Sequence, residues 1–366
     1  MIDQEMRAGD LLVEQRAALW KTKSFAACVR VQLLIPVCGW PMTNVLITVD
    51  TELSVGRHVH GLGGYSNLCE SVFGVCGQGS YGIQHQIQRL DAYGLKAVFF
   101  IDPMPAQVFG LDIIKRAVAP ILEAGHEAQL HIHTEWLPYL PVDPVDGRRG
   151  TSIRDFSYDD QRLLLGLARE LLMAAGAPAP LAFRAGNYGA SDTTLQALAS
   201  LGIAYDTSFN PGYGAEAPRI SLPLDTVEPT LHHGVVEFPV SSISDRPGHF
   251  RHAQLCALSA WEMRDALRHA VGCGQRYFTL VSHSFELLSR DRLRANRTVV
   301  DRFERLCAFL ADPGNGLKAQ TYSRLDPASL CQPAATPRLS PNLLRTAHRM
   351  GEQLLSGLRY ERRPAP

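Results

Sequence analysis

The sequence predicts an α/β fold, built as a distorted parallel (β/α) barrel of seven or eight strands. Short apolar runs of strand character alternate about eight times with stretches of helical periodicity. Polar residues follow the first, third, fourth, fifth and seventh predicted strands. A barrel gathers the carboxyl ends of all its strands at one face, whereas a doubly wound sheet gathers them near its switch point. The spread of polar residues over so many strands therefore favours the barrel.

The first predicted strand ends in two carboxylates. Val45 to Val49 is an apolar, β-branched run, which is typical of a buried parallel strand, and Asp50 and Glu52 follow it. Because strand side chains alternate, Asp50 and Glu52 share one face while Thr51 points elsewhere. An ordinary strand followed by a polar turn gives the same pattern, so this stretch alone leaves both interpretations open.

A second predicted strand ends in two histidines. The run that begins at Gly125 closes with His131 and His133, which share a face by the same alternation. A single histidine is more often a core or surface residue, but two at this spacing after an apolar run are harder to dismiss. Two imidazoles and one or two carboxylates at strand ends can form a divalent-metal site. We therefore predict metal binding at these strand ends.

The remaining elements follow in order along the chain. Helices are predicted over 82–93, 111–123, 158–175, 193–200, 260–271 and 299–310, and strands over 96–101, 181–184, 203–206, 235–240, 277–281 and 317–322. A long Gly-rich connection precedes the first helix and carries His58 and His60. Loops of this length are usually functional or disordered, so we interpret the two histidines as exposed residues or, at most, substrate-loop residues.

Composition bounds the class of protein. The 366 residues carry equal numbers of basic and acidic side chains, 36 each, with no basic patch, so we expect no nucleic acid partner. The eight cysteines form no C-x-x-C pair, which fits reduced thiols in the cytoplasm. Residues 20–40 are partly apolar but too short and interrupted for a spanning helix, so we expect no stable membrane insertion. A signal peptide or anchor there stays the alternative.

We predict one folded domain over residues 42–328. Residues 1–41 precede the first strand and are expected to form an N-terminal extension of poor order. Residues 329–366 are proline-rich, then basic and weakly helical, and are predicted to form a C-terminal tail. Nothing in the sequence indicates an oligomeric state.

With these strand ends in view, the chain resembles the polysaccharide deacetylase superfamily, whose shared unit is the NodB homology domain. The resemblance covers roughly residues 44–325 and rests on an ordered series of motifs, each modest alone. The motifs are Thr48-Val49-Asp50-Thr51-Glu52, Lys96 to Ile101, Gly125-His126-Glu127 through His131 and His133, Phe183-Arg184-Ala185-Gly186-Asn187-Tyr188-Gly189, Tyr205-Asp206-Thr207-Ser208 and Leu280-Val281-Ser282-His283. This resemblance implies the glycoside hydrolase/deacetylase type of barrel.

Two departures from the common family pattern indicate a variant site. The common first motif has two adjacent acids, and here Thr51 stands at the second position with Glu52 one place further on. The common form spaces its two histidines four apart, and here position 135 is Glu135, which leaves His133 as the nearest second histidine. We interpret the chain as a member of the D-x-E / H-x-H branch of the superfamily.

The resemblance implies metal-dependent hydrolysis of an N-acetyl group on an amino-sugar-containing substrate, such as a cell-surface polysaccharide or its precursor. Glu52, His131 and His133 would hold a divalent metal, with zinc the expected ion. Asp50 would act as the general base, and His283 would protonate the leaving amine. The roles of Asp50 and Glu52 could also be exchanged or shared.

The same resemblance gives three further residues a role. Arg184 would complete the catalytic set by pairing with Asp50 and holding it in place. The backbone N–H near Tyr188 would help to stabilise the oxyanion, although Tyr188 could simply pack under the site. Asp206 would support Arg184 or a histidine, with a turn-capping role as the alternative.

Two other functions stay open. One is a non-catalytic carbohydrate-binding protein on the same barrel, for which the missing second acid is the best support. The other is a metal amidohydrolase that acts on a non-sugar amide. The sequence does not separate a polymer, a lipid-linked sugar and a nucleotide sugar as substrates.

Overall fold

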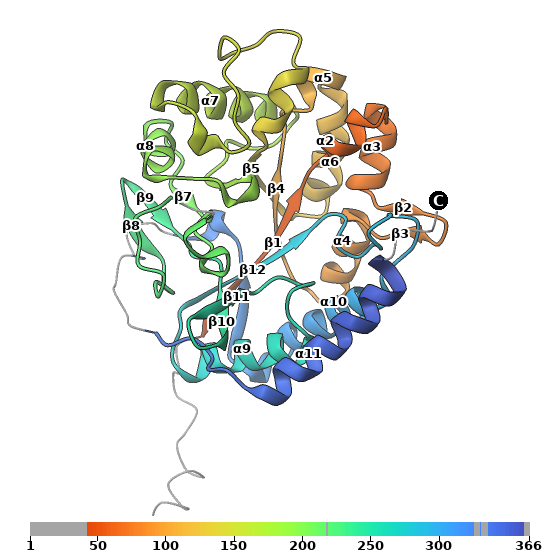
Figure 1. The fold of residues 1–366 in the computed structure, drawn as a ribbon, viewed down its shortest axis with the longest axis vertical. Coiled ribbons are helices and arrows are strands. Elements are labelled where there is room, and N and C mark those ends of the chain that lie inside the picture. Colours follow the sequence, from red (N-terminus) through yellow and green to blue (C-terminus); the bar gives the residue numbers. More distant parts are fainter. Residues whose placement is uncertain (1–41, 217–218, 326–329, 331–335, 362–366) are drawn as a thin grey trace, which may run out of the picture. The chain divides into compact units, whose positions relative to one another are not determined.

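The computed structural model describes residues 42–216, 219–325, 330 and 336–361. The predicted N-terminal extension lies outside the described residues. A curled sheet forms the centre of the fold (Figure 1). Its strands are β1 (Thr43–Thr51), β4 (Val98–Ile101), β5 (Glu127–Ile132), β6 (Ala182–Ala185), β7 (Tyr205–Asp206), β8 (Thr230–His232), β9 (Val235–Glu237), β12 (Tyr277–His283) and β13 (Leu317–Gln320).

The sheet is a parallel path with one antiparallel edge. Its hydrogen-bonded order is β12-β1-β4-β5-β6-β7-β9-β8, and β13 pairs with the first half of β1. Strand β8, at the end of the path, runs antiparallel to β9. Eight of these nine strands run parallel, which confirms the predicted parallel α/β barrel of seven or eight strands.

The barrel closes through irregular chain, which is where the predicted distortion lies. Beyond β9, the Ser241 N–H donates to the Thr279 carbonyl of β12 at 3.1 Å. The Ala253 N–H donates to the Ser241 carbonyl at 2.6 Å, and the Val281 N–H donates to the Ala253 carbonyl at 2.9 Å. Single extended residues therefore join β9 to β12 where a regular barrel would have a full strand.

The predicted helices surround the sheet (Figure 1). They are α4 (Ile83–Ala92), α6 (Asp112–Glu123), α7 (Tyr158–Ala174), α8 (Asp192–Ser200), α9 (Ala260–Gly272) and α10 (Arg297–Leu310). Local sequence explains their starts: the Ser157 hydroxyl accepts from the Asp160 N–H at the start of α7, and Ser259 forms a capping box with Glu262 in α9.

Short elements fill the connection that the sequence predicts as a long loop. They are α2 (Val55–Val59), α3 (Gly64–Ser71) and the hairpin of β2 (Val75–Cys76) and β3 (Gly79–Ser80). Helix α2 buries none of its residues, so it has no apolar stripe for periodicity to detect. Elsewhere the chain adds α5 (Ala106–Phe109) and the hairpin of β10 (Ser242–Arg246) and β11 (His249–His252).

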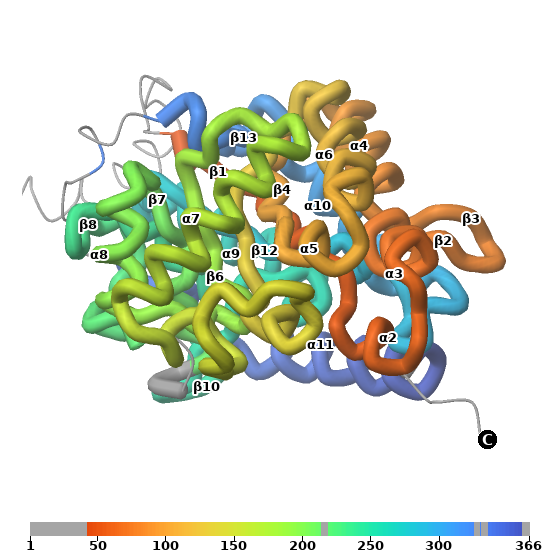
Figure 2. The backbone as a smooth tube through the Cα atoms, turned by 90° about the horizontal axis from the view of Figure 1, so that it is seen from above, coloured from red at the N-terminus to blue at the C-terminus, as the bar shows by residue number. Residues whose placement is uncertain are grey.

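Helix α11 (Leu343–Ser356) lies within the segment predicted as a C-terminal tail. Its Arg349, 3% exposed, donates from Nε to Glu262 of α9 at 3.1 Å and from Nη2 to Asp245 of β10 at 3.3 Å. Figure 2 shows α11 running along one side of the barrel. Because breaking a buried ion pair leaves an unpaired charge, these contacts hold α11 against the barrel.

Two whole-chain features bear on the sequence predictions. Within residues 42–361 as described above, no helix combines the length and the apolar character needed to cross a membrane. The described cysteines are free thiols, namely Cys69, Cys76, Cys256, Cys273 and Cys307.

Candidate active site

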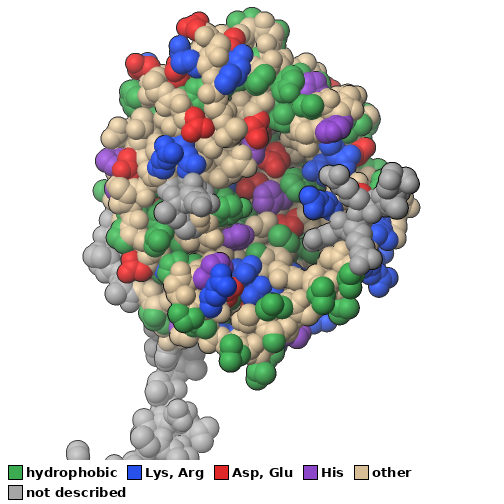
Figure 3. All heavy atoms as spheres, in the orientation of Figure 1, with side chains coloured by type: hydrophobic (Ala, Val, Ile, Leu, Met, Phe, Trp, Pro, Cys, Tyr) green, Lys and Arg blue, Asp and Glu red, His purple; other side chains and the backbone are tan. Residues whose placement is uncertain are grey.

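Adjacent parallel strands bring the candidate residues to one mouth of the barrel. In the sheet register, Asp50 of β1 pairs with His283 of β12, and His131 of β5 pairs with Arg184 of β6. Parallel strands end at the same rim, so these pairs place acids, imidazoles and a guanidinium together. Figure 3 shows acidic and histidine side chains gathered in a hollow near the middle of the face seen in Figure 1.

The end of β1 presents its acids as the alternation predicts. Asp50 is 3% exposed, and Thr51 is buried with its hydroxyl donating to the Val49 carbonyl at 3.2 Å. Glu52 lies beyond Thr51 and reaches the two histidines at the end of β5. Thr51 is thus turned away from the site, and Glu52 supplies the second carboxylate.

Glu52, His131 and His133 form a compact group of metal-ligand type. Oε2 of Glu52 lies 2.5 Å from Nε2 of His133 and 3.3 Å from Nε2 of His131. Neither contact has hydrogen-bond geometry, so this buried oxygen has no hydrogen-bond donor among the described residues. Three ligand atoms that converge without bonding to one another fit a carboxylate and two imidazoles around a divalent cation.

The far nitrogens of both imidazoles are also held. Nδ1 of His131 lies 2.7 Å from the Arg184 carbonyl, and Nδ1 of His133 lies 3.1 Å from Oε2 of Glu135. A carbonyl or carboxylate on Nδ1 places the proton there and leaves Nε2 as the free electron pair, which is how metal-binding histidines are usually oriented. Glu135, at the position where the common pattern has its second histidine, thus orients His133.

Charge couples Glu52 to His133. Burial alone would raise the pKa of Glu52, but the charge and close contact of His133, together with those of His131, outweigh burial and hold that pKa well below its usual value. Conversely, burial lowers the pKa of His133, but the carboxylates of Glu52 and Glu135 together outweigh burial and raise that pKa well above its usual value. The mouth therefore strongly favours an ionised Glu52, which is the form that binds a cation.

A fully buried ion pair fixes Asp50. Nη1 of Arg184 donates to Oδ1 of Asp50 at 2.6 Å, and neither side chain is more than 5% exposed. Arg184 is held in turn by its Nε donating to the Thr207 carbonyl at 3.3 Å and by stacking over the Phe100 ring at 4.6 Å. The pairing that the resemblance implied is therefore present, and it leaves Oδ2 of Asp50 facing the mouth.

His283 faces Asp50 across a short gap. Its Nε2 lies 3.9 Å from Oδ2 of Asp50, which is longer than a hydrogen bond. On the other side, Oε2 of Glu286 lies 3.6 Å from Nδ1 and accepts from the His283 backbone N–H at 2.9 Å. Burial lowers the pKa of His283, but Glu286 and Asp50 outweigh it and raise that pKa to about 9. The imidazole is thus a cation at neutral pH.

Tyr188 and Asp206 lie beneath the mouth. The Tyr188 ring packs against Val240 and Val281, and its backbone has a φ of 53° in the left-handed region. Asp206 is fully buried and accepts hydrogen bonds from the Ser208 N–H at 3.0 Å and the Ser208 hydroxyl at 2.8 Å. Asp206 therefore caps a turn behind Arg184 and makes no ion pair within 4 Å among the described residues.

The structure adds residues that the sequence reading did not place in the site. Glu286 lies in a turn, is buried, and also accepts from the Cys256 N–H at 2.6 Å. Asp102, at the end of β4, is 1% exposed, and burial raises its pKa to about 6. The contact between Glu286 and Cys256 depends on chain 30 residues away, so the strand patterns in the sequence do not signal it.

Arg292 packs on Phe285, the residue whose ring neighbours His283. Its guanidinium lies 4.3 Å above the Phe285 ring, and that ring lies 5.4 Å from the His283 ring. The backbone of Arg292 has a φ of 62°, a conformation that residues other than glycine adopt infrequently. No pattern in the sequence singles it out.

His58 and His60 take different places. His58 packs among Phe109, Trp136 and Tyr139, with ring centroids 5.1, 5.6 and 4.8 Å away. His60 is exposed, and its Nδ1 lies 2.6 Å from the Gly56 carbonyl. Neither approaches the Glu52 group within an ion-pair or hydrogen-bond distance among the described residues.

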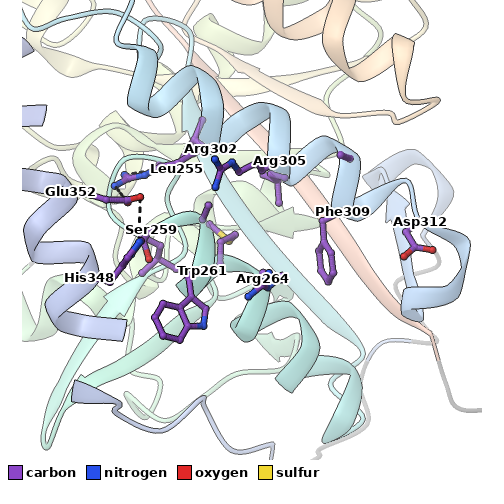
Figure 4. A pocket seen from close by; sticks show the side chains of 15 residues that line it. Leu255, Ser259, Trp261, Arg264, Arg302, Arg305, Phe309, Asp312, His348 and Glu352 are labelled. Atoms are coloured by element: carbon purple, nitrogen blue, oxygen red, sulfur yellow. Dashed lines mark hydrogen bonds and ion pairs between the residues drawn. The ribbon is translucent and has the colours of Figure 1, made fainter. Parts of the chain in front are cut away.

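A separate cavity of about 590 Å³ lies between α9, α10 and α11 (Figure 4). Apolar side chains such as Trp261 and Phe309 line it, together with Arg264, Arg305 and the ion pair of Arg302 with Glu352. It contains none of the mouth residues. The cavity has acids and a histidine of its own, Asp312, Glu352 and His348, but it is separate from the group of Glu52, His131 and His133.

Comparison with solved structures identifies the fold. A Mycobacterium smegmatis protein provisionally assigned as a polysaccharide deacetylase superposes with a TM-score of 0.51 at 16% identity, over 84% of this chain and 98% of that one. This chain has the polysaccharide deacetylase fold. At 16% identity, the shared property is the fold.

Two other solved structures match this chain at lower TM-scores. A family 4 carbohydrate esterase from Streptomyces lividans, in complex with acetate, matches at TM-score 0.40 and 12% identity, over 82% of this chain and 98% of that one. A 4-alpha-glucanotransferase from Thermococcus litoralis matches at TM-score 0.48 and 10% identity, over 80% of this chain and 41% of that one. No family model and no curated protein sequence matches the chain.

Proposed function

We propose that this chain is a metal-dependent deacetylase that hydrolyses an N-acetyl group on an amino-sugar-containing substrate. One observation carries the proposal: a Glu-His-His group and a separate Asp50–His283 pair meet at one barrel mouth. Hydrolysis of an amide needs an electrophile for the carbonyl, a base for water and an acid for the leaving amine. The fold shared with a protein assigned to the polysaccharide deacetylases supports the same reaction class.

Glu52, His131 and His133 would hold the cation, and zinc suits this donor set. When bound, such a cation polarises the acetyl carbonyl and lowers the pKa of water. The protein's part is to orient Nε2 of both imidazoles toward the cation through the contacts of Nδ1 with the Arg184 carbonyl and Glu135. Cation binding would displace the proton that His133 otherwise carries.

Asp50 is the proposed general base. Arg184 occupies Oδ1 at 2.6 Å, so the carboxylate cannot rotate freely, and Oδ2 is left to accept a proton from the attacking water. Oδ2 lies 3.9 Å from Nε2 of His283, too far for a hydrogen bond, so both atoms are left to bind water or substrate. A positioned proton transfer of this kind is typically worth about 10²–10⁴-fold in rate.

His283 is the proposed general acid. It carries a proton at neutral pH because its pKa is about 9, with Glu286 on the Nδ1 side. Nε2 faces the mouth and would donate its proton to the leaving nitrogen of the amide. The proposed order is therefore proton uptake at Oδ2 of Asp50 and proton delivery from Nε2 of His283.

Arg184, Tyr188 and Asp206 support these steps in the proposal. Arg184 orients Asp50, while Asp206 acts at one remove by fixing the turn that carries Thr207, a partner of Arg184. The Tyr188 backbone N–H remains the proposed second donor for the oxyanion.

Acetate release from a panel of amides tests the proposal. Zinc-loaded wild-type protein is incubated with N-acetylglucosamine oligomers, N-acetylated peptidoglycan fragments and non-sugar acetamides, with Asp50→Asn as the paired variant. We expect acetate and a free amine in equal amounts from an N-acetyl sugar, and almost none from the variant.

Two outcomes would replace the proposal. Release of acetate from non-sugar acetamides alone would make the chain a metal amidohydrolase of another substrate class. Saturable sugar binding with no acetate release, at full zinc occupancy, would make it a carbohydrate-binding protein on the same barrel.

A further inference from the structure

A second group of two histidines and one carboxylate lies on the flank of the barrel. Asp192 is the first residue of α8, and His232 and His233 belong to the connection between β8 and β9. Figure 1 shows the β8–β9 hairpin beside α8. Nε2 of His232 lies 3.0 Å from Oδ1 of Asp192, and Nε2 of His233 lies 3.5 Å from Oδ2 of Asp192. Both imidazoles thus aim the same nitrogen at one carboxylate.

The spacing of these atoms suits a tetrahedral cation. Zinc–nitrogen and zinc–oxygen bonds of about 2.0–2.2 Å put tetrahedral ligand atoms about 3.3–3.5 Å apart. The contacts of 3.0 and 3.5 Å, which run to the two different oxygens of Asp192, are close to that spacing, and one ligand atom from each residue lies within 4.8 Å of the others. The Ser221 hydroxyl, 3.2 Å from Nε2 of His232, offers a further oxygen at the same place.

The turn that presents the histidines is an unusual place for an imidazole. His232 pairs with Val235, so His233 and Gly234 form a two-residue hairpin loop, with φ of 47° and 85°. Loops with both residues at positive φ favour Asn-Gly or Asp-Gly. A histidine at the first of these positions is less favourable than Asn or Asp, which points to a role for its side chain.

The three side chains are also partly buried, as suits a cation site. The side chains of His232, Asp192 and His233 are 20%, 30% and 33% exposed, so a cation can enter while the group is partly shielded from water.

We propose that Asp192, His232 and His233 form a second divalent-cation site, which takes zinc and fastens the β8–β9 hairpin to α8. The ligands come from two segments about forty residues apart, so the bound ion would cross-link the edge of the sheet to a helix. The site shares no residue with the barrel mouth, and the proposal does not depend on deacetylase activity.

Zinc binding to the full-length His131→Ala/His133→Ala variant tests this site alone. The metal-free variant is titrated with zinc chloride, bound zinc is counted by elemental mass spectrometry after dialysis, and Tm is measured with and without zinc. We expect one zinc per chain and a rise in Tm. Adding His233→Asn, which suits the turn and so preserves the hairpin, should abolish both effects.

A matched control separates zinc binding from the loss of any His–Asp pair. In the same background, His249→Ala removes a histidine that lies 2.6 Å from Asp245 but has no second histidine beside it. That variant should bind zinc as its parent does. The proposal is overturned if the His131→Ala/His133→Ala protein binds no zinc, or if His233→Asn leaves its bound zinc unchanged.

Discussion

The barrel mouth and the flank hold the same donor set in different surroundings. Each has two imidazoles and one carboxylate within 4.8 Å. At the mouth, His131 is 2% exposed and Nδ1 of both histidines meets a carbonyl or a carboxylate. On the flank, Nδ1 of His233 has the Gln196 amide at 3.4 Å, and the side chains of His232 and His233 are 20% and 33% exposed.

This comparison teaches that donors alone indicate a cation, while their neighbours determine what the cation can do. Carboxylates and carbonyls behind the imidazoles strengthen metal binding by about 10–100-fold. Asp50 and His283, the proposed base and acid, lie beside the mouth group, and neither residue belongs to the flank group. We therefore expect tight binding and chemistry at the mouth, and weaker, structural binding on the flank.

The largest expected effect is on catalysis at the mouth. Asp50→Asn removes the proposed base but leaves Glu52, His131 and His133 in place. We expect kcat for acetate release to fall by about 10²–10⁴-fold while zinc content per chain stays the same. The exposed Asp225→Asn serves as the control and should match wild type. Full activity in Asp50→Asn at unchanged zinc content would remove Asp50 as the base.

A smaller effect is expected on zinc affinity. Glu135→Gln replaces the carboxylate 3.1 Å from Nδ1 of His133 with a neutral amide. We expect zinc at the mouth to bind about 10–100-fold more weakly, with the flank site unaffected. Competition with a chelator of known affinity measures both sites, and Gln196→Ala is the matched flank variant. Equal zinc affinities of the mouth in Glu135→Gln and wild type would contradict the claim that the carboxylate behind His133 makes the mouth bind zinc more tightly than the flank.

The smallest effect is a displacement of the pH profile. His283 must be protonated to act as an acid, so activity should persist below its pKa of about 9 and be lost as pH rises through that value. Glu286→Gln removes a negative charge that raises this pKa. The alkaline limb of kcat/KM should therefore move to lower pH.

A surface glutamate provides the control for this profile. Glu304 pairs with Arg89 at 2.5 Å and does not contact His283, so Glu304→Gln should keep the wild-type limb. If the limb of Glu286→Gln also stays in place, Glu286 does not tune His283, and the acid must be assigned to another group.

Much of the mouth could be predicted from strand periodicity. Asp50, Glu52, His131 and His133 follow apolar runs at a spacing of two, and period-two alternation forces each pair onto one face. The barrel could be predicted because helices and strands alternate with local signals, such as the capping box of Ser259 and Glu262.

The rest depends on contacts that local patterns do not encode. Glu286 meets the Cys256 N–H across 30 residues that include α9 and β12, so the sequence presents it as an ordinary acid near a turn. His232 and His233 are adjacent in sequence, a spacing that in a strand would send them to opposite faces. They converge because the turn at His233 and Gly234 reverses the chain.

A single zinc titration tests the account most directly. Metal-free wild-type protein is titrated with zinc while acetate release from an N-acetylglucosamine oligomer and Tm are followed in the same samples. We predict that acetate release saturates at the first equivalent of zinc and that the second equivalent raises Tm without further activity. Acetate release that requires the second equivalent, or no acetate at any zinc ratio, would contradict the assignment of the reaction to the barrel mouth.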